Sequence, residues 1–401
     1  MGFGMLRDLH QADWTRRAGL SALTAALGAE NIRWVGGAVR DGLLGVAVHD
    51  VDCATTLLPK DVIALCGKAG IRTVPTGIEH GTVTAILKDG PVEVTTLRRD
   101  VATDGRRATI AFASDWPEDA ARRDFTINAL YAHPETLEIA DFFGGLDDLA
   151  AGRVRFIGDA RQRIAEDHLR ILRYYRFQTR FGAALDEAAE DACADLAHTL
   201  KGLSRERIAA ELLNLLALPD PHATLARMKT RGVLGVILPE ACAPQLASLA
   251  RLIAAESAQG IAADPVRRLA ALLPPSPEVA ETVAARLRLS KAQRTRLVSA
   301  AERTANDAAD PKALAYRLTP PPAIDRLLLA GADARVLDGW SVPVFPLKGG
   351  AIVARGITAG PEVAKLLQLI ERRWVAEGFP GTDRVNQMLA EELGTSAFRF
   401  D

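Results

Sequence analysis

The chain changes character near Ala151, and this change limits the folds that it can adopt. Before Ala151, short segments with the alternation of half-buried strands are separated by helical ones; the strand-like segments are 32–36, 50–55, 81–87 and 92–97. After Ala151, strands nearly vanish, and amphipathic stretches rich in Ala and Leu take over at 205–217, 265–273, 291–308 and 360–377. The pattern predicts an α+β fold, with a mixed sheet and helices first and helices alone afterwards.

Composition sets softer limits. The chain has 401 residues, of which 48% are hydrophobic and 25% charged, as expected for a soluble globular protein of two or more domains. The formal net charge is −1, so any surface that binds nucleic acid must be local, as with the arginines between Arg153 and Arg180. We find no apolar run of about eighteen residues and no signal-peptide core in 1–18, which predicts a cytoplasmic protein without membrane contact.

The cysteines and histidines suggest no metal centre of their own. Four cysteines are spread without C-x-x-C pairing, which argues against structural zinc and disulfides and predicts buried thiols; they are Cys53, Cys66, Cys193 and Cys242. His49 beside Asp50 would suit a metal-dependent phosphohydrolase, but the other six histidines form no supporting motif. We therefore expect His49 to be a neighbour of the functional strand.

Two carboxylates and a glycine turn form the first candidate site. Asp50 and Asp52 are two apart on a predicted strand, so both side chains should leave the same face of the sheet. Carboxylates placed in this way can share divalent cations, and magnesium is usually held by one or two of them together with substrate phosphates. Gly36 and Gly37 lack a Cβ and permit close approach of a triphosphate. Each signal is weak when taken alone.

A third acid lies on a later strand. The alternation of apolar and polar residues over 91–98 predicts a half-buried strand that carries Glu93. Glu93 can complete a carboxylate triad, or it can be an ordinary exposed residue on the wet face of the sheet. The strand pattern leaves both possibilities open.

Two Arg- and Asp-rich motifs follow. In 122–130, Arg123, Asp124 and Asn128 crowd the start of an apolar segment, where Arg can fork onto phosphate oxygens and Asp can accept from a sugar hydroxyl.

The second motif, 166–176, has helical periodicity and a stripe of charges. Asp167, Arg170, Arg173 and Arg176 recur every third residue along one face. A surface face held by salt bridges at this spacing is the usual explanation of such a pattern. Three stacked arginines with few local acids would repel one another, so we favour a polyanionic ligand.

In order, spacing and residue type, these motifs resemble those of the class II tRNA nucleotidyltransferase and poly(A) polymerase family, which adds or extends RNA 3′ ends without a nucleic-acid template. The resemblance runs from about residue 32 to residue 213 and continues more weakly over 345–374. It implies attack of an RNA 3′ hydroxyl on the α-phosphate of CTP or ATP, with pyrophosphate as the leaving group and Mg²⁺ in a two-metal site.

The resemblance also assigns roles. Asp50, Asp52 and Glu93 look like the catalytic, metal-binding acids. Asp124 looks like the reader of the ribose 2′ hydroxyl, and Asp167 with Arg170 like a protein-side template for the edge of the base. The residues implied to bind nucleotide are Gly36, Gly37, Arg40, Arg123, Asp124, Asn128, Asp167, Arg170, Arg173 and Arg176.

Within the family, the residues favour the CCA-adding branch. The segment 76–84 resembles that of CCA-adding members, and 100–107 resembles their flexible loop, although a plain surface connection explains the latter equally well. No long basic C-terminal extension of the polymerase kind is present. We expect addition of CCA to the tRNA 3′ end, with a poly(A) polymerase or a CC-only or A-only enzyme as alternatives. An RNA-binding pseudo-enzyme is the non-enzymatic alternative, although the acids that such a protein tends to lose are present.

The resemblance implies four domains. They are a nucleotidyltransferase head or palm at 1–151, a helical neck with the base-reading helix at 152–220, a helical body at 221–340 and a helical, tRNA-binding tail at 341–401. The segment 204–208 resembles the neck motif that braces the base-reading helix, and a capping Ser before a salt-bridged helix explains it nearly as well. The implied partners are the tRNA 3′ end, CTP and ATP, and no protein partner is implied.

Overall fold

A seven-stranded mixed sheet lies at the centre of the N-terminal part of the chain. The computed structural model describes residues 6–103, 108–113, 115–183 and 185–394. The strands lie in the order β3 (Arg72–Gly77), β4 (Thr82–Leu87), β5 (Gly90–Thr96), β2 (Val51–Thr55), β1 (Ile32–Val35), β8 (Leu130–Ala132) and β9 (Ile139–Asp141). Strands β2 and β5 are parallel, and the other neighbouring pairs are antiparallel. The strands expected at 32–36, 50–55, 81–87 and 92–97 are confirmed as β1, β2, β4 and β5.

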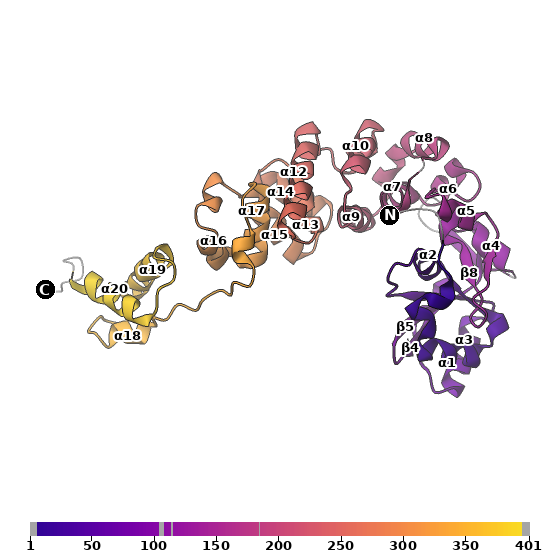
Figure 1. Cartoon of the computed structure of the whole chain (residues 1–401), viewed down its shortest axis with the longest axis horizontal. Coiled ribbons are helices and arrows are strands. Elements are labelled where there is room, and N and C mark those ends of the chain that lie inside the picture. The colour runs from indigo at the N-terminus through magenta and orange to yellow at the C-terminus, as the bar shows by residue number, and fades with distance from the viewer. Residues whose placement is uncertain (1–5, 104–107, 114, 184, 395–401) are drawn as a thin grey trace. The chain divides into compact units, whose positions relative to one another are not determined.

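The chain divides into two compact units, Met1–Pro239 and Glu240–Asp401, and the predicted boundaries at 151 and 220 fall inside the first. In the first unit, α1 (Ala18–Leu27) packs on α3 (Pro59–Lys68), which in turn contacts β3 and β4 (Figure 1). Its other α-helices are α2 (Gly37–Leu43), α4 (Trp116–Ala121), α5 (Gly145–Ala150), α6 (Ala160–Glu166), α7 (Arg170–Phe181), α8 (Glu187–Asp195), α9 (Arg205–Leu216), α10 (His222–Thr230) and α11 (Val233–Ile237).

A separate two-stranded sheet is formed by β6 (Arg98–Thr103) and β7 (Ala108–Phe112). Both strands fall in the region that contains the expected flexible loop, and residues 104–107 of that loop lie outside the described residues.

Local capping explains where several helices begin. Ser204 accepts from the backbone N–H of Arg207 at 3.3 Å and starts α9, as expected from the segment 204–208. Asp186 accepts from the N–H of Ala189 at 3.1 Å and starts α8 in the same way.

Aromatic packing fixes α7 against the sheet domain. The ring of Phe125 lies 4.8 Å from that of Phe156 and 5.3 Å from that of Phe177, measured between centroids. Phe156 also stacks on Tyr174 at 5.8 Å. Because Phe125 directly follows Asp124, this core determines where α7 stands relative to the predicted motif at 122–130.

The second unit is helical throughout the residues that the structure describes. Its α-helices are α12 (Ala243–Gln259), α13 (Pro265–Ala271), α14 (Pro277–Arg286), α15 (Lys291–Ala301), α16 (Pro311–Leu318), α17 (Pro320–Leu329), α18 (Gly349–Val353), α19 (Pro361–Ala376) and α20 (Thr382–Gly394). The continuous helix expected over 291–308 is wrong, because α15 ends at Ala301. The side chains of Thr304 and Asp307 cap a separate short turn there.

The last helices share their own core. Leu366, Ile370 and Trp374 of α19 pack on Met388 and Leu389 of α20, and all five are buried. None of the helices in the described residues is long and apolar enough to cross a bilayer. The four cysteines, all within the described ranges, form no disulfide. Three are buried as expected, but Cys242, the residue directly before α12, is exposed.

Candidate active site

Asp52 and Glu93 lie side by side on neighbouring strands. Strands β2 and β5 run parallel, and their register pairs Asp52 with Glu93. The residues on either side of each acid are buried, so both carboxylates leave the opposite, open face of the sheet. Asp50 is exposed and stands one residue before β2 begins. The parallel pairing therefore brings Asp52 and Glu93 together, and Asp50 is near enough for its charge to act on Asp52.

The surroundings of Asp52 disfavour the ionised form of its carboxylate. Solvent reaches the side chain, but the surrounding protein limits its hydration, and this together with the negative charges of Glu93 and Asp50 raises the pKa of Asp52. The guanidinium of Arg123 acts in the opposite direction. A divalent cation among these carboxylates would relieve their repulsion.

The three carboxylates suit a cation that also binds phosphate oxygens or water. In the ranges that the structure describes, no three Asp, Glu, His or Cys side chains converge closely enough to enclose a metal ion. Magnesium does not require such a cage, since it is commonly held by one or two carboxylates with phosphate oxygens and water. Asp52 with Glu93 and Asp50 matches that kind of site.

The glycine turn brings the backbone close to two arginines. Gly36 has a φ of 70°, which favours glycine, and a Cβ there would lie 3.5 Å from Nη1 of Arg123. Arg40, one turn into α2, is only 5% exposed. It donates from Nε to Asp41 at 2.9 Å and from Nη1 to the side-chain oxygen of Asn128 at 2.5 Å. Arg40 is thus held in one orientation beside the turn.

Arg123 is fixed by a buried acid and a tyrosine. Its Nη2 donates to Asp119 at 3.1 Å and its Nε donates to the hydroxyl of Tyr131 at 2.9 Å. Asp119 also accepts from Arg122 at 2.8 Å. Although burial opposes ionisation, Arg123 and Arg122 hold the pKa of Asp119 at about 2.

Asp124 joins the sheet domain to α7. It accepts from Nδ2 of Asn128 at 3.0 Å and from Nη2 of Arg173 at 2.6 Å. Burial opposes its ionisation, but Arg173 and the amide of Asn128 hold the pKa of Asp124 at about 2. This carboxylate is therefore charged at neutral pH and able to accept a further hydrogen bond.

The stripe expected along one helix is interrupted. Helix α6 ends at Glu166 and α7 begins at Arg170, so Asp167 stands in the turn between the two helices. One oxygen of Asp167 accepts from the N–H of Leu169 at 3.1 Å, and the other accepts from Arg207 of α9 at 2.7 Å. The turn aims Asp167 at the same space as the arginines of α7, but by a different local structure from the one predicted.

The expectation that the arginines of α7 have few acids near them is wrong. Arg170 pairs with Glu166 at 2.7 Å, Arg173 pairs with Asp124, and Arg176 pairs with Glu211 at 2.6 Å. These carboxylates offset much of the mutual repulsion, so repulsion alone does not demand a polyanion.

The predicted residues nevertheless line a single cleft of about 430 Å³. Its lining consists of Gly36, Gly37, Arg40, Asp52, Arg122, Arg123, Asp124, Asn128, Asp167, Arg170, Arg173, Arg176 and Phe177. Six arginines face three aspartates in this set, so the cleft has an excess of positive charge and attracts anions. All ten predicted nucleotide-binding residues are in it, together with Asp52.

A second cleft of about 260 Å³ shares Asp52, Arg122 and Arg123 with the first. It also contains Glu93 and the hydroxyl-bearing Thr95. Asp52 thus stands at the border of two polar clefts. Asp50 lines neither of them.

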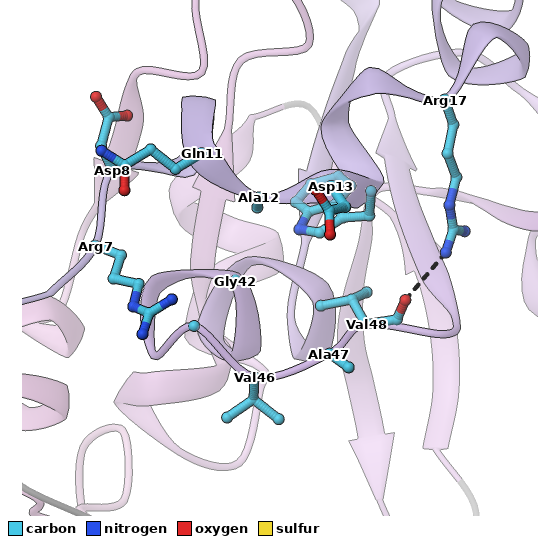
Figure 2. Close-up of a pocket in the computed structure, with 12 residues that line it drawn as sticks. Arg7, Asp8, Gln11, Ala12, Asp13, Arg17, Gly42, Val46, Ala47 and Val48 are labelled. Carbon is cyan, nitrogen blue, oxygen red and sulfur yellow. Dashed lines mark hydrogen bonds between the residues drawn. The ribbon is translucent and has the colours of Figure 1, made fainter.

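The loop that leads to Asp50 is fixed by the N-terminal segment. Arg17 donates to the carbonyl of Val48 at 3.0 Å, as Figure 2 shows, and to that of His49 at 3.3 Å. Gly45 has a φ of 67° in this loop, and a Cβ there would lie 2.3 Å from Nε of Arg7. A pocket of about 360 Å³ lies between the segment and the loop (Figure 2). His49 contributes its backbone carbonyl here, as suits a neighbour of the functional strand.

Sequence reasoning did not single out the buried acids that hold the cleft arginines. Asp119 lies three and four residues before Arg122 and Arg123, a helical spacing that can be read from sequence. Glu211 is 35 residues away from Arg176, and no local pattern connects the two.

Comparison with known proteins identifies two family regions. The model described as "Poly A polymerase head domain" matches residues 32–155, and the one described as "Probable RNA and SrmB- binding site of polymerase A" matches residues 182–243. The first region contains all three predicted acids and the glycine turn.

Relatives extend the similarity over most of the chain. The mitochondrial CCA tRNA nucleotidyltransferase 1 of Mus musculus is 35% identical over 392 residues, which cover 90% of this chain and 87% of the mouse protein. The CCA-adding enzyme of Streptococcus pneumoniae strain R6 is 43% identical over 197 residues, which cover 49% of this chain and 48% of that enzyme.

A solved structure agrees with the fold. The crystal structure of the Bacillus stearothermophilus CCA-adding enzyme in complex with CTP superposes with a TM-score of 0.72 at 27% identity, covering 94% of this chain and 98% of that one. The resemblance inferred from the motifs is confirmed, including its branch. The chain belongs to the class II tRNA nucleotidyltransferase and poly(A) polymerase family, in its CCA-adding branch.

Proposed function

We propose that this chain is an enzyme that adds C, C and A in turn to the 3′ end of tRNA, using CTP and ATP and releasing pyrophosphate. The observation that carries the proposal is a single cleft that is lined by Asp52, by six arginines and by Asp167. The arginines are able to bind the phosphates of a nucleotide. Relatives named as CCA tRNA nucleotidyltransferases, aligned over 90% of the chain, support the same reaction.

Enzymes of this family use a divalent metal, and we propose Mg²⁺ held by Asp50, Asp52 and Glu93. When bound, such ions neutralise charge on the attacking and leaving oxygens. The protein supplies a fixed pair of carboxylates, because the backbone of β2 and β5 sets their spacing before any ligand arrives.

We assign the phosphates to Arg40 and Arg123 and the backbone of Gly36 and Gly37. Both guanidiniums are anchored by carboxylates and aromatic rings, so little side-chain freedom is lost when a triphosphate binds. Asp124 then accepts from the ribose 2′ hydroxyl, which would make the enzyme select ribonucleotides.

We assign the base to Asp167 and Arg170. Three N–H groups of Arg170 are used by Glu166 and by the carbonyls of Arg163 and Arg122, which leaves two of its five for the base. Asp167 accepts from Arg207 and from Leu169 and keeps further lone pairs. An acceptor beside a donor matches the exocyclic amine and ring nitrogen of C and of A, and neither G nor U offers that pair.

The second cleft is suited to the RNA 3′ end. The incoming nucleotide fills the first cleft, and the attacking hydroxyl must reach its α-phosphate at Asp52, which borders both. The new bond joins the RNA 3′ oxygen to the α-phosphorus, and the bond to the bridging oxygen of pyrophosphate breaks. Arg122, shared by both clefts, faces the phosphates of either substrate.

We further propose that the helices beyond residue 151 act as neck, body and tail and hold the tRNA, as the family resemblance implies. The cytoplasm is the proposed compartment. Fluorescent tagging of the full-length protein in its own cells tests this, and accumulation in an organelle would contradict it.

Product length tests the reaction directly. Purified protein is incubated with Mg²⁺, a tRNA transcript that ends at the discriminator base, and CTP and ATP separately and together. CCA addition predicts two additions with CTP alone and a stop at three with both nucleotides. Chelation of the metal should abolish both reactions, and activity that survives chelation would contradict the metal assignment.

Other products would identify other enzymes. A-only extension of a CC-ended tRNA would mean that two enzymes divide the work. A ladder of A residues on any RNA would mean a poly(A) polymerase. No extension of any substrate would overturn the enzymatic proposal and favour an RNA-binding protein.

A further inference from the structure

We infer that Asp41 and Arg180 are positioning residues that hold Arg40 against α7, and that they thereby connect recognition of the base to binding of the triphosphate. The inference rests on the proposed function, in which Arg40 contacts the triphosphate and Arg170 at the start of α7 contacts the base.

Asp41 bridges two arginines from distant parts of the chain. It accepts from Arg40 at 2.9 Å from Nε and 2.8 Å from Nη2. It accepts on its other oxygen from Nη2 of Arg180 at 3.0 Å. Arg40 and Asp41 belong to α2, and Arg180 belongs to α7, 139 residues later than Asp41. The carboxylate therefore ties the helix after the glycine turn to the C-terminal end of the base-reading helix.

Two aromatic rings of α7 complete the contact. The guanidinium carbon of Arg40 lies 4.6 Å from the ring centre of Phe181 and 5.2 Å from that of Phe177. Arg180 lies 4.8 Å from the ring of Phe181. Cation–π contacts of this kind are strengthened when the cation is withdrawn from water, and Arg40 is only 5% exposed.

Burial makes Arg40 dependent on this support. Burial lowers the pKa of Arg40, the charge of Asp41 and its hydrogen bond act to raise it, and the nearby charge of Arg180 lowers it again. Without Asp41, two guanidiniums would face each other with no carboxylate between them. Asp41 and Arg180 line neither of the two clefts, so they act on a bound nucleotide through Arg40.

The arrangement connects the residues that bind the base of the nucleotide to those that bind its triphosphate. Helix α7 carries Arg170, Arg173 and Arg176, which line the cleft near Asp167, and its last turn carries the residues that hold Arg40. A movement of α7 that adapts the site to C or to A must therefore also move the support of Arg40, because the helix is a continuous rigid element. One helix, α7, then supports both the contacts to the phosphates and the contacts to the base.

The test combines binding and kinetics in three variants of the full chain. Asp41→Asn, Arg180→Gln and Arg180→Lys are titrated with CTP in the presence of Mg²⁺ and without RNA by calorimetry, and their KM and kcat for CTP and ATP are measured on tRNA. We expect Asp41→Asn and Arg180→Gln to raise the Kd of CTP and both nucleotide KM values by about five- to tenfold, with a smaller change in kcat and none in the KM for tRNA. Arg180→Lys, which keeps the charge, should recover most of the loss.

A double variant and a control separate this role from general destabilisation. Because Arg180 acts through Asp41, the double variant should bind CTP no more weakly than Asp41→Asn alone. Arg161→Gln is the matched control, since Arg161 forms an exposed pair with Asp195 away from the clefts and should leave every constant unchanged. A variant that merely unfolds would lose active sites, and hence kcat, while its remaining folded fraction kept the wild-type Kd.

Three outcomes decide the matter. Unchanged Kd and KM values in Asp41→Asn and Arg180→Gln, or losses that add in the double variant, would overturn the inference. If the wild type binds CTP but extends no RNA, the proposed function falls while the binding data still decide the role of Asp41. If the wild type does not bind CTP at all, both fall.

Discussion

Both units bury arginine–carboxylate networks in the part of the chain that the structure describes, but the network of the first unit lines a cleft and the network around Glu256 in the second unit does not line that cleft or the one beside it. In the second unit, Glu256 accepts from Arg267 and Arg268 at 2.8 Å each, and Asp325 accepts from Arg267 and Arg296. Glu256, Arg267, Arg268 and Asp325 are all 3% exposed or less, and none of them lines a cleft described above. This network joins α12, α13, α15 and α17 to one another.

In the first unit, similar pairs face a ligand-sized space. Asp119 holds Arg123 from outside this cleft and Asp124 holds Arg173 within it, and both arginines line the cleft together with Asp52. The comparison shows that burial and pairing of charges do not by themselves mark a functional site. The cleft of the first unit differs in that its paired arginines share it with Asp52, a carboxylate that forms no ion pair within the described residues.

The largest expected effect is that of a substitution at Asp52. Asp52→Asn should reduce nucleotide incorporation by about 10⁴-fold, because it removes a carboxylate that we propose holds the metal. The same change should leave the protein as stable or slightly more stable at neutral pH. The raised pKa of Asp52 means that its ionised form opposes folding, and an amide removes that charge. Single-turnover assays and thermal unfolding measure the two effects, and substantial residual turnover would refute the assignment.

The opposite pattern is expected at Glu256. Glu256→Gln should destabilise the second unit by about 3 kcal/mol, since an amide removes the negative charge that the buried guanidiniums of Arg267 and Arg268 share, although Arg267 keeps its contact with Asp325. At a temperature where the variant is folded, its KM for CTP should equal that of the wild type. Hydrogen exchange followed by mass spectrometry locates the loss to α12–α17. Asp333→Asn, at an exposed pair, is the control and should change nothing measurable.

A selectivity measurement sharpens the account of the cleft. Asp167→Ala should narrow the preference for CTP over UTP by about 10- to 100-fold while changing triphosphate affinity much less. The reason is that the acceptor for the exocyclic amine is lost, whereas Arg40 and Arg123 remain. Competition assays with mixed nucleotides measure this ratio, and Asp195→Ala on the exposed end of α8 serves as the matched control. Undetectable UTP and GTP incorporation in the variant would contradict a protein template.

The last expected effect concerns stability in acid. Asp119 and Asp124 have pKa values of about 2 in the folded chain, below the ordinary value of an unfolded Asp. Their stabilisation is complete above about pH 4 and is lost as the pH falls toward 2, at about 2 kcal/mol for each group. Urea unfolding of the first unit, followed by hydrogen exchange between these limits, measures the loss. A stability independent of pH in this window would show that the two acids are not held as described.

Local patterns account for much of the fold. The alternation of polar and apolar residues is sufficient to predict β1, β2, β4 and β5, because each strand carries its own signal. Helices such as α9 and α19 also agree with the expected segments to within a residue or so, since Ser and Pro punctuate their starts.

The remainder depends on long-range contacts. Nothing near Asp52 in the sequence shows that β2 will pair with β5 and bring Glu93 beside it. The partners of Arg173 and Arg176 are 49 and 35 residues away, which is why the acids near α7 were underestimated. The break at Asp167 was missed because three charged positions on α7 continue its spacing with no proline or glycine between them. The motif order predicts which residues meet in the cleft, but not the contacts that hold them there.

The parallel pairing of β2 and β5 also determines when the acid pair can form during folding. Strands β4 and β5 meet through a tight connection, with Leu87 opposite Gly90, whereas β2 must wait for α3, β3 and β4 to be in place. Contacts between distant segments carry the larger loop-closure entropy and form slowly. Pulse-labelled hydrogen exchange should therefore protect the amides of β4 before those of β2. The proposed metal-binding carboxylates Asp52 and Glu93 would then be among the last parts of the sheet to come together, so we expect a newly made chain to bind a divalent metal there only after β2 has paired with β5.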